Sequence, residues 1–225
     1  MKRLAARIVL VSSILAFVSS LAAAQAFQNG SFEVGNPGPG PCFATLPAGD
    51  TRISGWTVID GNVDWYGPSC SILPSDGLNS LDLVGDQTIG GIQQTFDTNP
   101  GQVYTISFDL NGNYGAGPAI KPLTVTIGAD VHNFTFDTTG ESAANFRSRY
   151  QTETISYTAT GTSTTISFVS DTTGQGFNAG AVIDNVRFGG AAPANPVSTL
   201  SPALLAVLAA ALATTGVLLA NRRSG

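Results

Sequence analysis

The sequence predicts an all-β domain that folds as an antiparallel β-sandwich. In Val103–Leu110 every second residue is large and apolar, which is the period of a half-buried strand. The segment Asn99-Pro100-Gly101 just before it has the proline and glycine of a type II turn. The same alternation recurs along the chain in short segments rich in Thr, Ser, Val, Ile and Phe. Nine or ten such strands without a helical period indicate a sandwich or barrel.

The first elements are expected between residues 27 and 66. Phe27–Val34 reads as a short opening strand that carries a carboxylate near its end. Gly35–Asp50 is dense in Gly and Pro and is expected to be an irregular loop. Ile53–Ile59 and Asn62–Tyr66 are expected to pair as a hairpin, because Asp60-Gly61 between them is a favoured two-residue turn.

Alternating strands continue to residue 188. Gly67–Gly77 reads as a loop, Ser80–Val84 as a strand, and Gly90–Asn111 as two strands joined by a tight turn in a hairpin. Gly112–Pro118 is a glycine-rich loop, and Asp137–Tyr150 is a polar connection. The remaining strands are expected in 123–127, 134–136, 154–157, 164–169 and 181–188.

The two ends of the chain have the composition of export and anchoring segments. Residues 1–26 carry basic, then apolar, then small residues, which is the order of a secretory signal peptide with cleavage after Ala24 or Ala26. Residues 203–225 hold an uncharged apolar run followed by an arginine pair, and are expected to form a transmembrane or sorting segment. Residues 191–202 form the linker. The sequence therefore predicts an exported domain, 27–190, anchored in the cell envelope or released from it.

The charge of this domain argues against nucleic acid as a partner. Residues 27–190 hold five basic residues against fifteen acidic ones, a net charge of −10. Nucleic-acid-binding proteins need Lys and Arg to neutralise phosphates. The surplus of carboxylates instead suits an extracellular module and a hard cation such as calcium.

Cys42 and Cys70 are the two cysteines of the chain, and both lie in expected loops. In an oxidising compartment such a pair is most simply one disulfide. A metal site would need more ligands than these two thiols supply.

Ordered motifs across 27–188 carry a family resemblance. The segments are Asn29-Gly30-Ser31-Phe32-Glu33, Ile53-Ser54-Gly55-Trp56-Thr57, Gly61-Asn62-Val63-Asp64, Ser80-Leu81-Asp82-Leu83, Pro100-Gly101-Gln102-Val103-Tyr104, Phe136-Asp137-Thr138-Thr139-Gly140 and Ile183-Asp184-Asn185-Val186. Together they resemble the choice-of-anchor C family of bacterial surface proteins, which is related to the DUF642 domains of plant cell-wall proteins. The resemblance implies a galactose-binding-like jelly roll, a scaffold used by many carbohydrate-binding modules.

The C-terminal segment resembles a known class of surface-sorting signal. Val197-Ser198-Thr199-Leu200-Ser201 is similar to the Pro-Thr-Leu-Ser type, with Ser198 where that pattern has proline. The similarity implies a sorting protease as a partner, and the departure at Ser198 puts recognition by that protease in question.

The resemblance also implies a structural calcium between the first and last strands. Carbohydrate-binding relatives with these opening and closing motifs hold calcium between the carboxylates that correspond to Glu33 and Asp184, and Asp50 is a further candidate ligand. Calcium prefers six to eight oxygen ligands. The alternative is that Glu33 caps a turn and Asp184 accepts hydrogen bonds from neighbouring backbone amides.

Aromatic residues beside glycine-rich loops are the candidate sugar-binding residues. A flat ring covers the apolar face of a pyranose while polar neighbours bond its hydroxyls. The candidates are Trp65, Tyr66 and Tyr114 with Asp64 and Asn113. The alternative for the aromatic residues is packing in the core or a loop, and Trp56 is expected in the core.

Catalysis has little support in the sequence. His132 is the only histidine and lacks the context of a hydrolase triad. We therefore expect a non-catalytic surface module that binds carbohydrate, either extracellular polysaccharide or a cell-envelope glycan. The alternatives are an adhesive envelope protein without a sugar ligand and an enzyme that acts on polysaccharide.

Overall fold

Ten strands in the described part of the chain form two packed antiparallel layers, as the sequence predicts. A computed structural model describes residues 25–36, 38–86, 89–173 and 178–190. The expected signal peptide, linker and C-terminal segment lie outside these residues. No helix among the described residues has the length and apolar character needed to cross a membrane.

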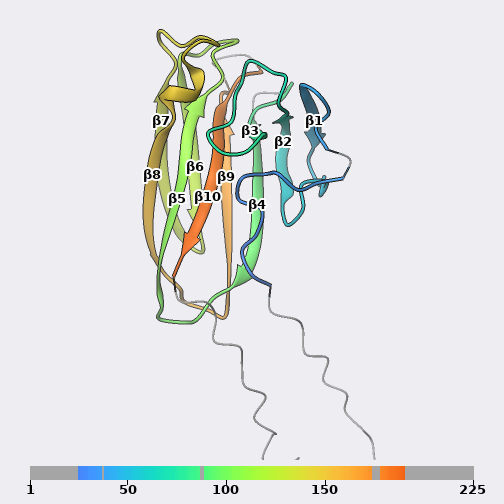
Figure 1. Cartoon of the computed structure of the whole chain (residues 1–225). Helices are drawn as coiled ribbons and strands as arrows, with labels where there is room; N and C mark the ends of the chain where they lie inside the picture. Colours follow the sequence, from blue (N-terminus) through green and yellow to red (C-terminus); the bar gives the residue numbers. More distant parts are fainter. Residues whose placement is uncertain (1–24, 37, 87–88, 174–177, 191–225) are drawn as a thin grey trace, which may run out of the picture.

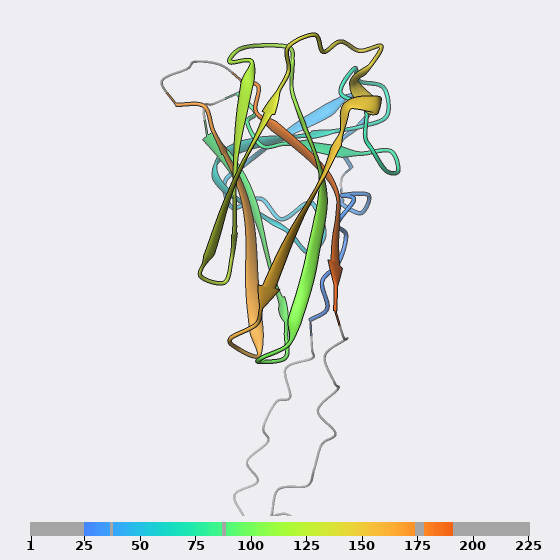
Figure 2. The ribbon, with the colours of Figure 1, turned by 90° about the vertical axis from the view of Figure 1, so that its left-hand side faces the viewer.

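Each layer is an antiparallel sheet in which the strands do not follow one another in sequence order, and one strand takes part in both sheets (Figures 1 and 2). The first sheet has the order β7 (Asp130–Asp137), β6 (Ile120–Ile127), β9 (Ser163–Asp171), β4 (Ile89–Asp97) and β2 (Thr57–Tyr66). The second sheet has the order β1 (Phe43–Pro47), β2, β3 (Ser80–Asp82), β10 (Ala181–Gly189), β5 (Val103–Gly112) and β8 (Gln151–Thr158). A short 3-10 helix, η1 (Phe146–Arg149), precedes β8.

The predicted hairpin at Asp60-Gly61 is wrong, because β2 runs through these residues as one strand. Asp60 has φ 52° and Gly61 has φ 26°, and the register of β2 against β4 shifts between Ile59 and Gly61. The positive φ values therefore bend the strand in the manner of a β-bulge instead of reversing it. Its first part pairs with β4, and its second part, Asn62–Tyr66, pairs with β1 and β3.

The predicted hairpin of β4 and β5 is wrong for a related reason. The turn itself is present: Gly101 has φ 79° and the amide of Gln102 donates to the carbonyl of Asn99 over 3.0 Å. However, β4 pairs with β2 and β9, whereas β5 pairs with β10 and β8. The turn therefore passes the chain from one sheet to the other.

Two predictions near the start of the domain are also wrong. Residues 27–34 form no strand, because Asn29 and Phe32 have φ 53° and 56° and close a turn. Residues 35–50, expected to be irregular, contain β1. This strand lies at the edge of its sheet and ends in Pro47, where a missing backbone donor is tolerated.

The core lies between the sheets and is rich in aromatic side chains. The predicted alternation in β5 is confirmed, since Tyr104, Ile106 and Phe108 are at most 2% exposed. Trp56 lies in the core as expected, and its indole Nε1 donates to the carbonyl of Asn29 over 2.9 Å. Full burial of a side chain such as that of Phe108 stabilises the folded state by about 1.5–3 kcal/mol.

The first and last described residues leave the domain at one end (Figures 1 and 2). Gln25 accepts a hydrogen bond from Asp97 at the end of β4, and Gly190 lies against Tyr104 at the start of β5. The other end of β5 continues into the loop 113–119, at the opposite end of the sandwich. That end carries the candidate site.

Candidate ligand-binding cleft

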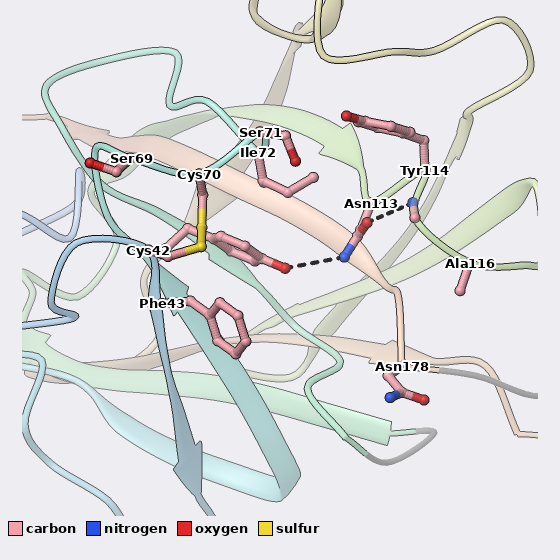
Figure 3. A pocket seen from close by; sticks show the side chains of 12 residues that line it. Cys42, Phe43, Ser69, Cys70, Ser71, Ile72, Asn113, Tyr114, Ala116 and Asn178 are labelled. Atoms are coloured by element: carbon pink, nitrogen blue, oxygen red, sulfur yellow. Dashed lines mark hydrogen bonds between the residues drawn. A yellow bond between two sulfur atoms is a disulfide. The ribbon is translucent and has the colours of Figure 1, made fainter.

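A cleft of about 610 Å³ opens where β1, the end of β2 and two loops meet (Figure 3). Phe43 and the Cys42–Cys70 disulfide lie on one side of it, and Tyr114 lies on the other (Figure 3). Its lining side chains carry no formal charge: Cys42, Phe43, Tyr66, Ser69, Cys70, Ser71, Ile72, Asn113, Tyr114, Gly115, Ala116 and Asn178.

The alternation of β2 carries Tyr66 to the cleft. Val63 and Trp65 pack in the core between the sheets, so Tyr66 projects from the outer face of the second sheet. There it packs with Ile72 in a second apolar cluster. Its cross-strand neighbour is Phe43, with 5.5 Å between the ring centroids. The two rings form one wall.

The predicted disulfide between Cys42 and Cys70 is present, with 4.7 Å between the Cα atoms. It joins the start of β1 to the loop after β2. Two backbone hydrogen bonds support the same junction, from Gly67 to the carbonyl of Cys42 and from Ser69 to that of Pro41, over 2.5 and 2.7 Å. The wall formed by Ser69 and Cys70 is thus held to the sheet by covalent and hydrogen bonds.

Asn113 connects Asp82, which lies beneath the cleft, to the loop that carries Tyr114. Its side-chain Nδ2 donates to Asp82 Oδ2 over 2.7 Å and to the hydroxyl of Tyr66 over 3.4 Å. Its Oδ1 accepts from the amide of Gly115 over 2.8 Å. Every polar atom of this side chain is therefore paired within the protein, so Asn113 positions its neighbours instead of offering groups to a ligand.

Asp82 is a fully buried carboxylate beneath the cleft. Its Oδ1 accepts from the amides of Val84 and Gly180 over 2.9 and 3.0 Å. Burial raises the pKa of Asp82 to about 7, and the hydrogen bonds from Asn113 and the backbone oppose that rise. A buried charge of this kind is tolerated because each oxygen has a donor.

Lys121, which the sequence analysis did not single out, is also completely buried. Its Nζ donates to the carbonyls of Ala116 and Ala179 over 2.7 and 2.9 Å, and burial lowers its pKa to about 8. The ammonium joins two segments beside the cleft. Its signal in the sequence was parity, because Lys121 falls on the same face of β6 as the buried Leu123 and Val125.

Two of the five predicted sugar-binding residues do not reach the cleft. Trp65 is 0% exposed and its Nε1 donates to the carbonyl of Phe32 over 3.0 Å, so its ring has no face open to a ligand. Asp64 is buried at the β1–β2 pairing, where it accepts from the hydroxyl of Thr45 over 2.6 Å. The structure does bring Tyr66, Asn113 and Tyr114 together.

The three predicted calcium ligands accept hydrogen bonds from separate groups. Asp50 pairs with Arg52, with 2.8 Å between Oδ2 and Nε. Glu33 Oε1 accepts from the amides of Leu78 and Asn79, each over 2.9 Å. In the described part of the chain, no three His, Cys, Asp or Glu side chains gather closely enough to hold a metal.

The carboxylate of Asp184 is completely buried and binds the segment 75–79 at the end opposite to the one that Glu33 binds. Its Oδ2 accepts from the amides of Ser75 and Asp76 over 2.8 and 2.9 Å. Burial raises its pKa to about 7 against these bonds. Glu33 and Asp184 therefore hold the segment 75–79 from both ends, which is the alternative that the sequence left open, and the calcium prediction stays a prediction.

Comparisons with known proteins give a family, one relative and several folds. The family model described as "Protein of unknown function (DUF642)" matches residues 25–189. Halomucin of Haloquadratum walsbyi is 31% identical over 208 residues, which are 88% of this chain. The chain spans 2% of that relative's length.

Similar solved structures include two carbohydrate-binding modules. One is TmCBM61 in complex with beta-1,4-galactotriose, 17% identical, with 74% of this chain and 98% of that chain covered and a TM-score of 0.44. Another is a family 35 carbohydrate binding module from Clostridium thermocellum, 10% identical, with 64% and 97% covered and a TM-score of 0.41.

Proposed function

We propose that this chain, which belongs to the DUF642 family, is an exported, non-catalytic module whose cleft binds carbohydrate. The observation that carries the proposal is the lining of the cleft. Aromatic rings of Phe43, Tyr66 and Tyr114 lie beside the hydroxyls of Ser69 and Ser71 and the exposed amide of Asn178. Rings that cover apolar sugar faces and polar groups that bond hydroxyls are the two parts of a sugar site.

The size of the cleft supports this reading. Small-molecule sites have volumes of roughly 300–1,000 Å³ and combine apolar walls with a few polar groups. The cleft has about 610 Å³ and both kinds of group. Phe43 lines the cleft and is 49% exposed, so part of its ring is accessible to a ligand.

Rigidity of the walls supports the proposal further. The disulfide holds one wall, and the bonds of Asn113 and Lys121 hold the others. A site that is ordered before binding loses less conformational entropy when the ligand arrives. Glycosidases act through two carboxylates, whereas the described lining consists of uncharged side chains, which favours binding over hydrolysis.

The proposal includes display at the cell surface. The loop 113–119, which contributes to the cleft lining, lies at the end of the sandwich opposite the first and last described residues (Figures 1 and 2). If residues 203–225 anchor the chain in the envelope, the cleft faces outward toward polysaccharide. Cell fractionation tests this part, since the processed chain should appear in the envelope or the medium.

A structural calcium at Glu33 and Asp184 also remains a proposal. If calcium is bound there, calcium should raise the melting temperature of the full-length chain relative to an EDTA-treated sample. Equal melting temperatures would remove calcium from the account and leave the cleft unaffected.

The binding function is tested by titrating the full-length chain with a panel of soluble polysaccharides. At least one should bind, and Tyr114→Ala should weaken that binding at least about tenfold, since stacking and buried ring area are lost. Val131→Ala, an exposed position on β7, is the control and should bind as the parent does. Release of reducing sugar from any polysaccharide of the panel would instead support the alternative of an enzyme that acts on polysaccharide.

A further inference from the structure

We propose that the cleft selects uncharged glycans and rejects uronic-acid, sulfated or otherwise anionic ones. This inference rests on the proposed function and names its ligand class. It follows from where the charges around the cleft lie, and from which of them are already engaged within the protein.

The first observation is the uncharged lining. None of the described residues that line the cleft has an ionised side chain. Proteins that bind carboxylate or sulfate groups present Arg or Lys to them, because charge-assisted bonds are needed to offset the desolvation of the anion. Hydroxyls and rings, as found here, recognise neutral sugars.

The second observation is that Lys121, a cation bonded to a residue of the cleft lining, is engaged within the protein. Lys121 is 0% exposed, and its Nζ donates to two backbone carbonyls behind the cleft wall, those of Ala116 and Ala179. Turning the ammonium toward a ligand would break both bonds and leave two carbonyls unpaired. Arg149 is likewise occupied by the carbonyls of Asp137 and Thr139, and Arg147 is exposed on η1 but does not line the cleft.

The third observation is the pair of carboxyl groups, Asp82 and Asp64, that lie close to the Tyr66 hydroxyl. Asp82 lies directly below Asn113, with 2.7 Å between the bonded atoms. Burial, and then the charges of Asp82 and Asp64, raise the pKa of the Tyr66 hydroxyl far above its ordinary value. That hydroxyl is a hydrogen-bond donor, and an anion placed beside it would meet the same two carboxyl groups, which repel it when they are ionised.

The fourth observation is the charge of the whole domain. The described residues contain five basic and fifteen acidic side chains, a net charge of −10. A polyanionic glycan would approach a negatively charged surface, which slows encounter and weakens binding most at low ionic strength. A neutral glycan has no such penalty.

The test compares one polysaccharide in three chemical forms against the full-length chain. The tightest neutral binder of the panel is used as it is, after oxidation of its C6 hydroxymethyl groups to carboxylates, and after methyl esterification of those carboxylates. In low salt the oxidised form should bind at least about tenfold more weakly, as expected for like charges separated by a few ångströms of protein. The esterified form should bind as tightly as the neutral form. In 1 M salt the difference in affinity between the neutral and oxidised forms should become smaller.

A charge placed on the rim makes the test sharper. Ser69 is exposed and lines the cleft, so Ser69→Lys should strengthen binding of the oxidised form severalfold. The matched variant Ser69→Gln should leave the difference in affinity between the neutral and oxidised forms unchanged, and so should Arg147→Gln.

The outcomes separate the two claims. Equal or tighter binding of the oxidised form in low salt would overturn the selection for neutral glycans while leaving carbohydrate binding intact. Failure of the esterified form to recover would also overturn it, because shape and not charge would then explain the loss. If no form binds, the proposed function itself fails.

Discussion

The carboxylate of Asp82 and the side-chain amide of Asn113 form a buried hydrogen bond at the base of the cleft, with 2.7 Å between Oδ2 and Nδ2. Because Asp82 is acceptor-only when ionised, this bond fixes which end of the Asn113 amide points downward. The Oδ1 atom is then directed at the amide of Gly115. One bond thus sets the shape of the loop that carries Tyr114.

Asn113→Ala tests this arrangement. It removes the donor to Asp82 Oδ2 and the acceptor for Gly115, so the free energy of unfolding should fall by about 1–3 kcal/mol. Glycan affinity should fall as well, although Asn113 has no free group for a ligand. Asn178→Ala changes an exposed asparagine that lines the same cleft and should leave stability within about 0.5 kcal/mol. Equal stability of the two variants in urea unfolding would contradict the positioning role.

Trp65→Ala should act on stability and not specifically on binding. The indole is completely buried and bonded to the carbonyl of Phe32, so its removal should cost about 3–5 kcal/mol. Tyr114→Ala, at a partly exposed position in the cleft, should cost much less while it reduces affinity. Denaturant unfolding and titration of both variants check the contrast. A stable Trp65→Ala protein that had lost only its binding would place Trp65 in the site after all.

Replacing Cys42 and Cys70 together by serine should lower both stability and affinity. The bond closes a loop with a sequence separation of 28, and its loss should reduce the free energy of unfolding by about 3 kcal/mol in the chain-entropy estimate. Affinity should drop because the wall containing Ser69 is no longer held against β1. Thermal melts with and without reductant provide the measurement, and a melting temperature insensitive to reductant would count against this role.

The stability of the domain should fall as pH rises from about 4 to 7. Burial raises the pKa of both Asp82 and Asp184 from 3.8 to about 7. In this window the folded chain binds more protons than the unfolded chain, so each such group lowers the free energy of unfolding by at most about 1.4 kcal/mol per pH unit. Asp184→Asn removes one of these groups and should reduce the slope.

Asp137→Asn is the control for that measurement. Hydrogen bonds from Thr139 lower the pKa of Asp137, so its contribution changes only at more acidic pH. The slope between pH 4 and 7 should therefore stay as in the parent. Unfolding free energies that stay level or rise across this window would show that the two buried carboxyls ionise normally.

Periodicity was sufficient for the architecture but not for the connections. The alternation in β5 and β6 predicted which side chains enter the core, since parity along a strand is a local property. Asp60-Gly61 misled the prediction because positive φ values serve a bend as well as a turn. Which sheet β4 and β5 each join depends on long-range pairing that no local pattern records.

The candidate site was also predictable only in part, because residue types can be read from the sequence whereas strand register cannot. Tyr66 and Tyr114 were found because aromatic residues beside glycine-rich loops are typical of sugar sites, and the structure places both in one cleft. Trp65 differs from Tyr66 only in strand parity, which a predicted hairpin with an uncertain register left undetermined. The resemblance to DUF642 domains is confirmed by the match over residues 25–189, while the choice-of-anchor C assignment and the sorting signal stay predictions.

Mapping a bound glycan onto the chain tests the central claim most directly. Backbone amide resonances of the full-length protein would be followed by NMR as a saturating neutral oligosaccharide is added. The account predicts the largest shifts at Ser69, Ile72, Tyr114 and Gly115, which line the cleft. Shifts confined to other surfaces, such as β7, or no shifts with any glycan of the panel, would contradict it.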